Sequence, residues 1–504
     1  MERIKKIYSN ERNVLLFTFL TIFVGVSIAL KLSGMSGNDF WWHIKSGEWI
    51  VNHKKVPTTA LFTWYGQEQN LNWFAHEWLT EVLFYGIYTA FGQLGMYEFC
   101  LLTGIIIIMC VFCLNKDYFF NNTFLSCIYM FYFTLVITLF FYGRPHTINM
   151  IFLFILLAML YQYKKKSSKI IYALPVFSII WVNFHGGSSN LIYIIPIIFI
   201  VGSIISFDYG KVQFKSMGSK NLIELSIITL ISTCALCLNP RGFEMIKYPF
   251  TNMADKTMLN SLSEWMAPDA KDFGILILCF VPVILVSVVF VTTSKKIDSV
   301  DFLLFGFFTY MFFRSQRFIS LFMITTSYFA FKYMMPFNEK KKKKKLSSTP
   351  QQNLIVFSTT FIFFIALIIG QFVSAASHSD KLIDRILPSE YAKFIKEDAP
   401  QRLYNDYDCG GPLIFNEVPV FVDGRADIYT GDTLKNFQTL KHCRNYNSKK
   451  LNNDSYMEDL LKQYDFDAFF VGKKWPIYNY LINRPDKYKV LKSDDTYAYF
   501  RVIQ

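Results

Sequence analysis

Long apolar runs separated by short polar segments make up most of residues 1–373. About eleven of these runs are long and apolar enough to predict helices that cross a membrane. The first run is too long for the apolar core of a signal peptide, so we expect a retained span. The predicted limits are 13–32, 94–114, 123–142, 146–162, 170–184, 189–206, 221–238, 273–292, 299–313, 317–335 and 352–373.

A different pattern begins at about residue 374. The tail is rich in Asp, Lys, Asn and Tyr, and it contains no run that could cross a bilayer. We therefore expect a polytopic α-helical membrane domain at 1–373 and a small α/β domain at 374–504. Predicted strands lie at 413–415, 418–422, 468–471 and 497–502, predicted helices lie near 389–397 and 456–463, and a hairpin tip is expected at 494–495.

The long polar loop at 33–93 carries a helical pattern of its own. Over residues 76–91, apolar side chains repeat on one helical face, while Glu77 and Glu81 fall together on another face. This pattern predicts an amphipathic helix that lies along the membrane surface.

Charge orients the predicted spans. The formal net charge is +13, only 18% of the residues are charged, and Lys and Arg lie in short loops and tails between apolar runs. This is the positive-inside pattern, and it argues against nucleic-acid binding. We expect a multi-pass plasma-membrane protein with a cytoplasmic N-terminus and an extracytoplasmic C-terminal domain. If successive spans alternate in direction, four basic clusters lie on the cytoplasmic side, at 164–169, 211–220, 295–296 and 340–345. The last cluster is expected to contact anionic lipid headgroups.

Candidate chemistry gathers on the opposite face. Asp39 stands just after the first span, within a stretch that also holds Trp42 and His43. Glu77, with His76 beside it, begins the amphipathic helix and supplies a second carboxylate. The structural alternatives are a capping role for Asp39, belt anchoring for the tryptophans, and a helix-dipole role for Glu77.

Cationic side chains also occur on the outer face, against the usual bias. Singly, each arginine could be an interfacial residue whose charged end reaches water. Together they predict phosphate binding, because the guanidinium group suits bidentate contact with phosphate. The residues with this expected role are Arg144, Arg241, Arg314 and Arg317, with His146 beside them.

Three further groups complete the candidate set. His185 precedes two glycines at a span end, where a ligand could approach the backbone or the helix could simply stop. Glu264 lies in the fourth outer loop, either lining the site or solvated. Asp423 and Arg425 stand together in the tail, either for recognition of an acceptor or lipid phosphate, or as an internal pair that holds a loop.

In this order, these pieces resemble bacterial polytopic glycosyltransferases of the GT-C class. The matching segments are Asp39-Phe-Trp-Trp-His43, His76-Glu-Trp-Leu79, Asn183-Phe-His-Gly-Gly187, Asn239-Pro-Arg-Gly242, Glu264-Trp265, Asp406 with Gly410-Gly411, and Asp423-Gly-Arg425. The resemblance implies a polyprenyl-phosphate-linked sugar donor, Asp39 in the acidic position of the first outer loop, and residues 76–91 as the juxtamembrane helix. Some relatives have two Asp residues spaced by one at that position, whereas here the first is Gly37. A divalent metal, Mg²⁺ or Mn²⁺, is therefore left open, and no metal ligand is assigned.

The chemistry of glycosyl transfer fits the same residues. A carboxylate accepts the proton of the acceptor hydroxyl, and fixed cations stabilise the leaving phosphate. We expect a glycosyltransferase of the cell envelope that acts on an outer-face glycan, lipid or protein, with Asp39 as base and Glu77 and His43 in support. A polymerase or ligase of surface polysaccharide falls within this expectation. The alternatives are a transporter or flippase of lipid-linked saccharide, and a non-catalytic envelope assembly protein.

Overall fold

The computed structural model describes most of the chain. The described residues are 10–31, 37–141, 143–254, 257, 259, 262, 264–335, 349–378, 387–425, 427–429, 431–444 and 454–503. The basic run predicted at 340–345 lies outside them.

The chain forms two compact units. Unit 1 contains residues 1–35, 94–239 and 267–379, and unit 2 contains residues 36–93, 240–266 and 380–504. This division cuts across the boundary predicted at residue 374, because the first outer loop and the fourth outer loop belong to the same unit as the tail.

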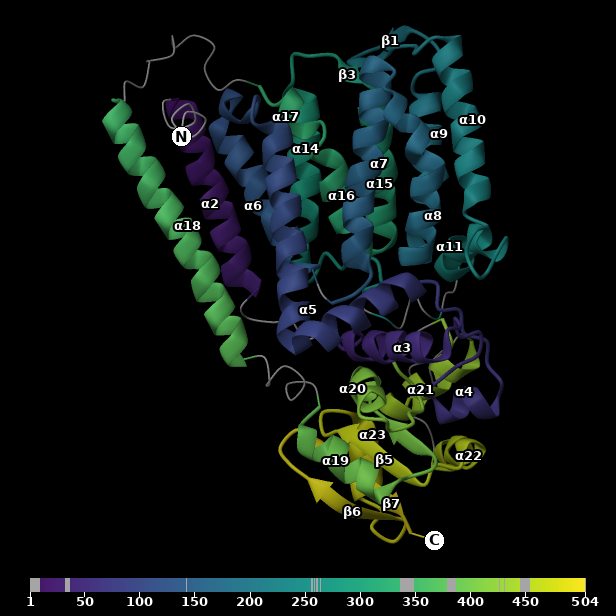
Figure 1. The fold of residues 1–504 in the computed structure, drawn as a ribbon. Helices are drawn as coiled ribbons and strands as arrows, with labels where there is room; N and C mark the ends of the chain where they lie inside the picture. Colours follow the sequence, from purple (N-terminus) through teal and green to yellow (C-terminus); the bar gives the residue numbers. More distant parts are fainter. Residues whose placement is uncertain are drawn as a thin grey trace. The chain divides into compact units, whose positions relative to one another are not determined.

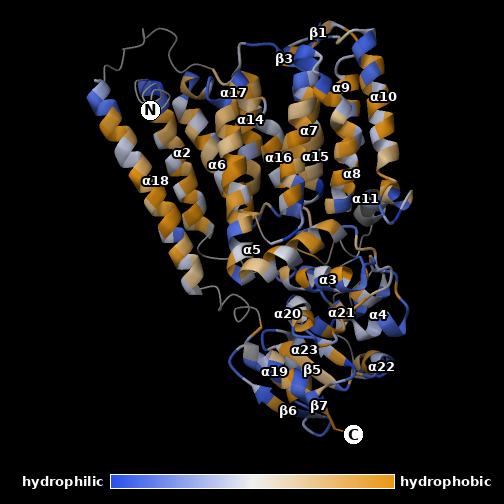
Figure 2. Cartoon of the chain, viewed as in Figure 1, coloured by the Kyte–Doolittle hydropathy of each residue, from blue (hydrophilic) through white to orange (hydrophobic). Residues whose placement is uncertain are grey.

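Unit 1 consists mostly of apolar helices that run side by side (Figure 1), and their surfaces are largely hydrophobic (Figure 2). Within the described part of the chain, five helices are long and apolar enough to cross a membrane: Glu11–Leu30, Trp78–Asn115, His146–Lys166, Phe273–Thr292 and Pro350–Ser377. The helices are α2 (Glu11–Lys31), the second part of α5 (Trp78–Asn115), α6 (Thr123–Leu139), α7 (His146–Lys166), α8 (Leu174–Phe184), α9 (Leu191–Val201), α10 (Ser219–Ala235), α13 (Phe273–Ile275), α14 (Val281–Thr292), α15 (Ser299–Arg314), α16 (Ile319–Thr326), α17 (Ala330–Tyr333) and α18 (Pro350–His378).

The span predicted at 317–335 is interrupted. It contains α16 and α17 with a turn between them. At the end of α16 the Thr326 hydroxyl donates to the Phe322 carbonyl and the Ser327 hydroxyl to the Ile324 carbonyl. Such side-chain bonds to the preceding turn compete with a continuing helix, which accounts for the break.

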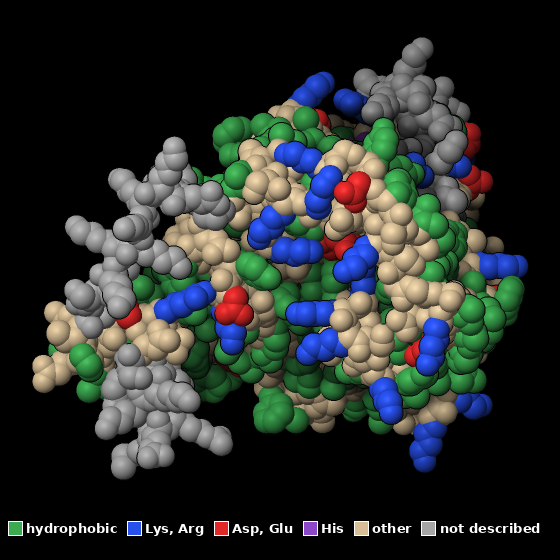
Figure 3. Space-filling model, turned by 90° about the horizontal axis from the view of Figure 1, so that it is seen from above, with side chains coloured by type: hydrophobic (Ala, Val, Ile, Leu, Met, Phe, Trp, Pro, Cys, Tyr) green, Lys and Arg blue, Asp and Glu red, His purple; other side chains and the backbone are tan. Residues whose placement is uncertain are grey.

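Lysines gather at one end of unit 1. There, β1 (Phe207–Tyr209), β2 (Val212–Phe214) and β3 (Ile297–Asp298) form a small sheet. Lys164 pairs with Asp298, and Lys296 pairs with Asp208, so basic clusters from distant loops meet around this sheet. Figure 3 looks onto this end and shows many basic side chains. This arrangement is consistent with these clusters lying on the same side of a membrane. Which side they face stays a prediction.

The tail part of unit 2 is built on a four-stranded sheet of order β4-β5-β7-β6. β4 (Leu403–Asn405) and β5 (Ala468–Gly472) are parallel, while β7 (Tyr497–Val502) is antiparallel to β5 and to β6 (Tyr488–Ser493). Strands therefore occur at 468–471 and 497–502, as predicted. The helices are α19 (Ser389–Asp398), α20 (Gly410–Phe415), α21 (Asp432–His442), α22 (Asp454–Tyr464) and α23 (Pro476–Ile482).

Two predicted strands of the tail were wrong. Residues 413–415 belong to helix α20, whose first residues are Gly410, Gly411 and Pro412. Residues 418–422 do not join the sheet. Instead, the Val420 N–H donates to the Phe62 carbonyl and its carbonyl accepts from Trp64, so this segment pairs with the first outer loop.

The first outer loop contributes three helices to unit 2. They are α3 (Phe40–His53), α4 (Trp64–Glu68) and the first part of α5, which begins at Trp78 and leaves helical geometry at Gly92. The predicted amphipathic helix is thus present from Trp78. Gly92 has φ 62° and ψ −155°, a conformation open to glycine alone at low cost, so the chain bends there.

Trp64 ties the loop to the tail. Its indole N–H donates to the Leu403 carbonyl at 3.0 Å, and its ring stacks on Phe421 with centroids 5.6 Å apart. Trp42 and Trp73 also belong to the hydrophobic core that contains the sheet residues of the tail. The loop and the tail therefore share one core.

We expect Trp64→Ala to destabilise the tail by about 3–5 kcal/mol, because a buried indole and its hydrogen bond are lost. Native-state hydrogen exchange of the β4 and β5 amides measures this free energy. Trp49→Ala is the control, since Trp49 is half-buried and stacks on His53 within α3. Unchanged protection in Trp64→Ala would show that the loop and tail do not share a core.

Candidate functional site

Asp39 lies against the backbone of the tail. It directly precedes α3, and its Oδ1 atom contacts Gly424 so closely that a Cβ at residue 424 would overlap it. The same Cβ would lie 3.0 Å from Trp42 Nε1. That indole N–H is buried and makes no hydrogen bond within the described part of the chain. A carboxylate acceptor and an N–H donor therefore lie side by side on Gly424.

A second glycine permits a similar approach. A Cβ on Gly411 would collide with the carbonyl oxygen of Asn38, and the Asn38 side chain donates to Asp408 at 3.0 Å. The glycines of the tail motifs thus let the tail backbone pack on the turn that carries Asp39. A role in helix caps or strand ends does not account for these glycines.

Tyr407 is surrounded by acids of this site. Burial and then the negative charges of Asp39, Asp423 and Glu264 raise the pKa of its hydroxyl well above the ordinary value. Tyr407 therefore stays a neutral hydrogen-bond donor at physiological pH. Its environment also places Glu264, predicted from the fourth outer loop, electrostatically close to Asp39 and the tail.

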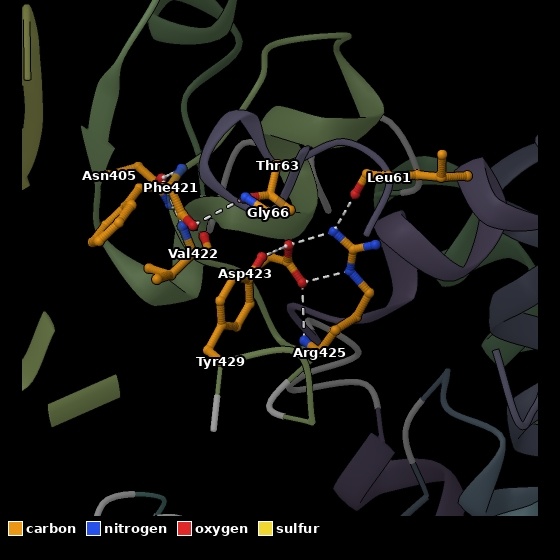
Figure 4. A network of polar contacts seen from close by, with 9 residues as sticks. All are labelled: Leu61, Thr63, Gly66, Asn405, Phe421, Val422, Asp423, Arg425 and Tyr429. Carbon is orange, nitrogen blue, oxygen red and sulfur yellow. Dashed lines mark hydrogen bonds and ion pairs between the residues drawn. The ribbon is translucent and has the colours of Figure 1, made fainter. Parts of the chain in front are cut away.

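The loop beneath Asp39 is held by a buried ion pair (Figure 4). Arg425 donates to Asp423 from Nε at 2.8 Å and from Nη2 at 2.6 Å, and both side chains are fully removed from solvent. Arg425 also donates to the Leu61 carbonyl, and the Tyr429 hydroxyl donates to Asp423. This arrangement favours the structural alternative for the pair, an internal contact that holds a loop; a binding role for these two residues stays a prediction.

Neighbouring segments close the network around this loop. The Asn405 amide group donates to the Val422 carbonyl and accepts from the Phe421 N–H, while the Thr63 hydroxyl donates to the Phe421 carbonyl. Figure 4 shows these bonds converging from the first outer loop and the tail. The Arg425 guanidinium further stacks over the Trp73 ring, 4.5 Å from its centroid.

A chain of titratable groups runs through unit 2 beside Asp39. The His43 ring nitrogens lie 3.9 Å from Glu77 and 3.5 Å from Glu81, and His76 Nε2 lies 3.4 Å from Glu77. His43 is one helical turn after Asp39, with its backbone N–H bonded to the Asp39 carbonyl. The structure thus brings His43, Glu77 and His76 close together, and their role in a site stays a prediction.

His76 continues this chain toward two residues from other segments. Its Nδ1 is 2.9 Å from the Tyr248 hydroxyl, which donates to Asp427 at 3.2 Å. Burial alone would lower the pKa of the imidazole, but the charges of Glu77 and Asp427 outweigh it and raise the pKa. His76 is therefore biased toward its cationic form.

Arg241 lies near the His76 end of this row of titratable groups. Its guanidinium rests on the Phe74 ring and pairs with Glu244 at 2.9 Å. Burial lowers its pKa to about 10, which leaves it charged at neutral pH. Arg241 is thus a cation of unit 2 close to His76 and Tyr248.

The remaining predicted residues lie in unit 1. His146, at the start of α7, lies 3.1 Å from the Ser320 hydroxyl of α16, and its ring centroid is 6.2 Å from that of His185 at the end of α8. Arg144 lies two residues before α7, Arg314 is the last residue of α15, and Arg317 lies in the short 3-10 turn before α16. Three predicted outer turns therefore meet at one end of the bundle. Whether Arg144, Arg314 and Arg317 approach Asp39 stays a prediction.

Two residues near the site, Tyr407 and Tyr248, were given no role from the sequence, while Asp427 was considered only together with Asp423 and Arg425. Tyr407 and Asp427 lie inside motifs that stood out for their acids and glycines, so these motifs were the available signal. Tyr248 carries no signal, because a tyrosine in an amphipathic loop segment is ordinary in a membrane protein.

Metal ligands are sparse around Asp39. Among the described residues, no group of three or more His, Cys, Asp or Glu side chains is placed to hold a metal ion. Mg²⁺ is often held by one or two carboxylates and substrate phosphates, so a divalent metal at this site stays a prediction.

Comparison with known proteins gives limited information. No protein-family model and no curated protein sequence matches the chain. Among solved structures, the chain is similar to the oligosaccharyltransferase of Archaeoglobus fulgidus in the apo form, with a TM-score of 0.47 and 11% sequence identity. The similarity covers 91% of this chain and 69% of that chain. A similarity at this level does not establish a shared activity.

We expect Asp423→Ala to destabilise the tail by about 3–5 kcal/mol, because it leaves the Arg425 charge buried without its partner. Hydrogen exchange of the β4 amides measures the change. Asp432→Ala is the control, since Asp432 pairs with Lys435 at the surface and should have little effect. Equal protection in the two variants would contradict a structural role for the buried pair.

Proposed function

We propose that the protein is a membrane glycosyltransferase that moves a sugar or oligosaccharide from a polyprenyl-phosphate-linked donor to an acceptor on the outer face. One observation carries the proposal. The Asp39 carboxylate lies on Gly424 beside the Trp42 N–H, with Tyr407 close to it, in a loop fixed by a buried ion pair. A carboxylate with nearby neutral donors is suited to bind and deprotonate a hydroxyl group.

In the proposed reaction, the acceptor oxygen forms a bond to the anomeric carbon while the bond from that carbon to the phosphate oxygen breaks. Asp39 accepts the proton of the acceptor hydroxyl. The electron pair of the broken bond leaves with the polyprenyl phosphate, so charge and atoms balance. The Trp42 N–H and the Tyr407 hydroxyl are the donors that would hold sugar oxygens next to Asp39.

The cations have the complementary task. As the phosphate leaves, its negative charge grows, and fixed positive groups lower the energy of that state. In unit 2 these groups are Arg241 and His76, which share contacts with Tyr248. From the sequence, Arg144, Arg314 and Arg317 are further candidates for this task. His43 and Glu77 would maintain the charge and orientation of the residues around Asp39.

Asp39→Asn is expected to lower turnover by about 10²- to 10⁴-fold, the usual contribution of a general base. The assay follows release of polyprenyl phosphate from synthetic polyprenyl-phosphate-linked hexoses by the full chain in lipid nanodiscs. Asp432→Asn, a surface change in the same unit, is the matched control. If Asp39→Asn retains full turnover while properly inserted, Asp39 is not the base.

Gly424→Ala is expected to reduce turnover strongly, because its methyl group would displace the Asp39 carboxylate. Gly86→Ala is the matched control, since residue 86 is exposed on α5 with open space around it. That change should leave turnover intact and favour the helix slightly. Both rates are measured in the same nanodisc assay, and equal rates would refute the contact between Asp39 and residue 424.

A further inference from the structure

Helix α11 (Glu244–Ala254) in unit 2 has two contrasting faces. Met245, Tyr248 and Pro249 are buried, and Tyr248 contacts His76 and Asp427. On the other face, Phe250 is 51% exposed, and Phe243, which directly precedes the helix, is 63% exposed. Large aromatic rings at this exposure need a partner, since exposed apolar surface of this kind marks contact sites.

The exposed rings are arranged with a cation between them. Lys247 and Phe250 are three residues apart in α11 and lie on one side of the helix, and Phe243 stands in the turn directly before it. The Lys247 ammonium lies 5.3 Å from the Phe243 ring centroid. Thr251 is exposed about 100° further around the helix from Phe250, so a polar edge borders the aromatic face.

The position of α11 along the chain indicates what covers this face. Helix α11 follows apolar α10 in the chain. The loop after α11 leads into the apolar helix Phe273–Thr292. The segment between α10 and α11 forms hydrogen-bonded turns rather than extended chain. The Leu238 N–H donates to the Ala235 carbonyl, and the Glu244 N–H donates to the Arg241 carbonyl. Asn239 is fixed to the end of α8 through the Val182 carbonyl. The helix therefore starts close to the end of a membrane span.

We propose that Phe243, Lys247 and Phe250 form a lipid-contact face that lies in the bilayer interface. The two rings would enter the boundary between headgroups and acyl chains, and Lys247 would pair with lipid phosphate. A positively charged, aromatic face next to a span fits a bilayer with anionic lipid. The opposite face of the same helix carries Tyr248, so lipid contact would also hold Tyr248 against His76 and Asp427. This proposal does not depend on the glycosyltransferase assignment.

Photo-crosslinking in nanodiscs that contain phosphatidylglycerol tests the proposal directly. p-Benzoylphenylalanine replaces Phe243 or Phe250 in the full chain, and lipid adducts are quantified by mass spectrometry. Residue 251 is the matched control on the same helix, and Ile362, exposed on α18, is the positive control. We expect lipid adducts at residues 243, 250 and 362 and no adducts at residue 251. Adducts at 362 without adducts at 243 or 250, or crosslinks from 250 to a second protein chain, would overturn the proposal.

A second measurement uses the unmodified protein. Acetylation of Lys247 by a water-soluble reagent should be slower in these nanodiscs than in lipid-free amphipol, because lipid covers and pairs with the ammonium group. Lys393 is the control, since its side chain is 80% exposed on the tail, and its rate should not change. Equal Lys247 rates in the two preparations would overturn the proposal.

Discussion

Asp423 and Arg425 are both removed from solvent, and each satisfies the charge of the other through two hydrogen bonds. Taking two charges out of water costs several kcal/mol per ion, and this cost is offset by the direct contact of the pair and by further hydrogen bonds to each partner. Tyr429 and the Leu61 carbonyl supply these partners. The result is a loop with one well-defined geometry, and Gly424 at its centre is the surface on which Asp39 rests. The candidate site depends on this pair because it fixes the residues on both sides of Gly424.

Around this loop, the protonation state of each group is set by its surroundings more than by its residue type. Tyr407 stays neutral because it is buried and carboxylates surround it, whereas the charges of Glu77 and Asp427 outweigh burial and raise the pKa of His76. Donors and an acceptor thus lie on one side of α3 and its loop, and cationic groups lie toward Tyr248 and Arg241. Such separation suits a reaction in which a hydroxyl loses a proton and a phosphate gains charge.

Under the proposed lipid contact, helix α11 would link this chemistry to the membrane. Its buried face contributes Tyr248 to the chain of titratable groups, and its exposed face presents two phenylalanines and a lysine. A lipid-linked donor would meet both properties at once, because its phosphate needs cations and its chain needs the bilayer. The fourth outer loop is therefore more than a connection between spans.

The sequence by itself determined the apolar helices, the basic clusters between them, the strands at 468–471 and 497–502, and the amphipathic helix of the first loop. Each of these follows from periodicity or composition within a short window. It also picked out Asp39, Glu77, His76, Asp423 and Arg425 as unusual. Only the tertiary structure decided that the first loop and the tail share one core, that residues 418–422 pair with that loop, and that Gly424 faces Asp39. Those contacts join residues far apart in the chain, and no local pattern encodes which distant backbone a glycine will let approach.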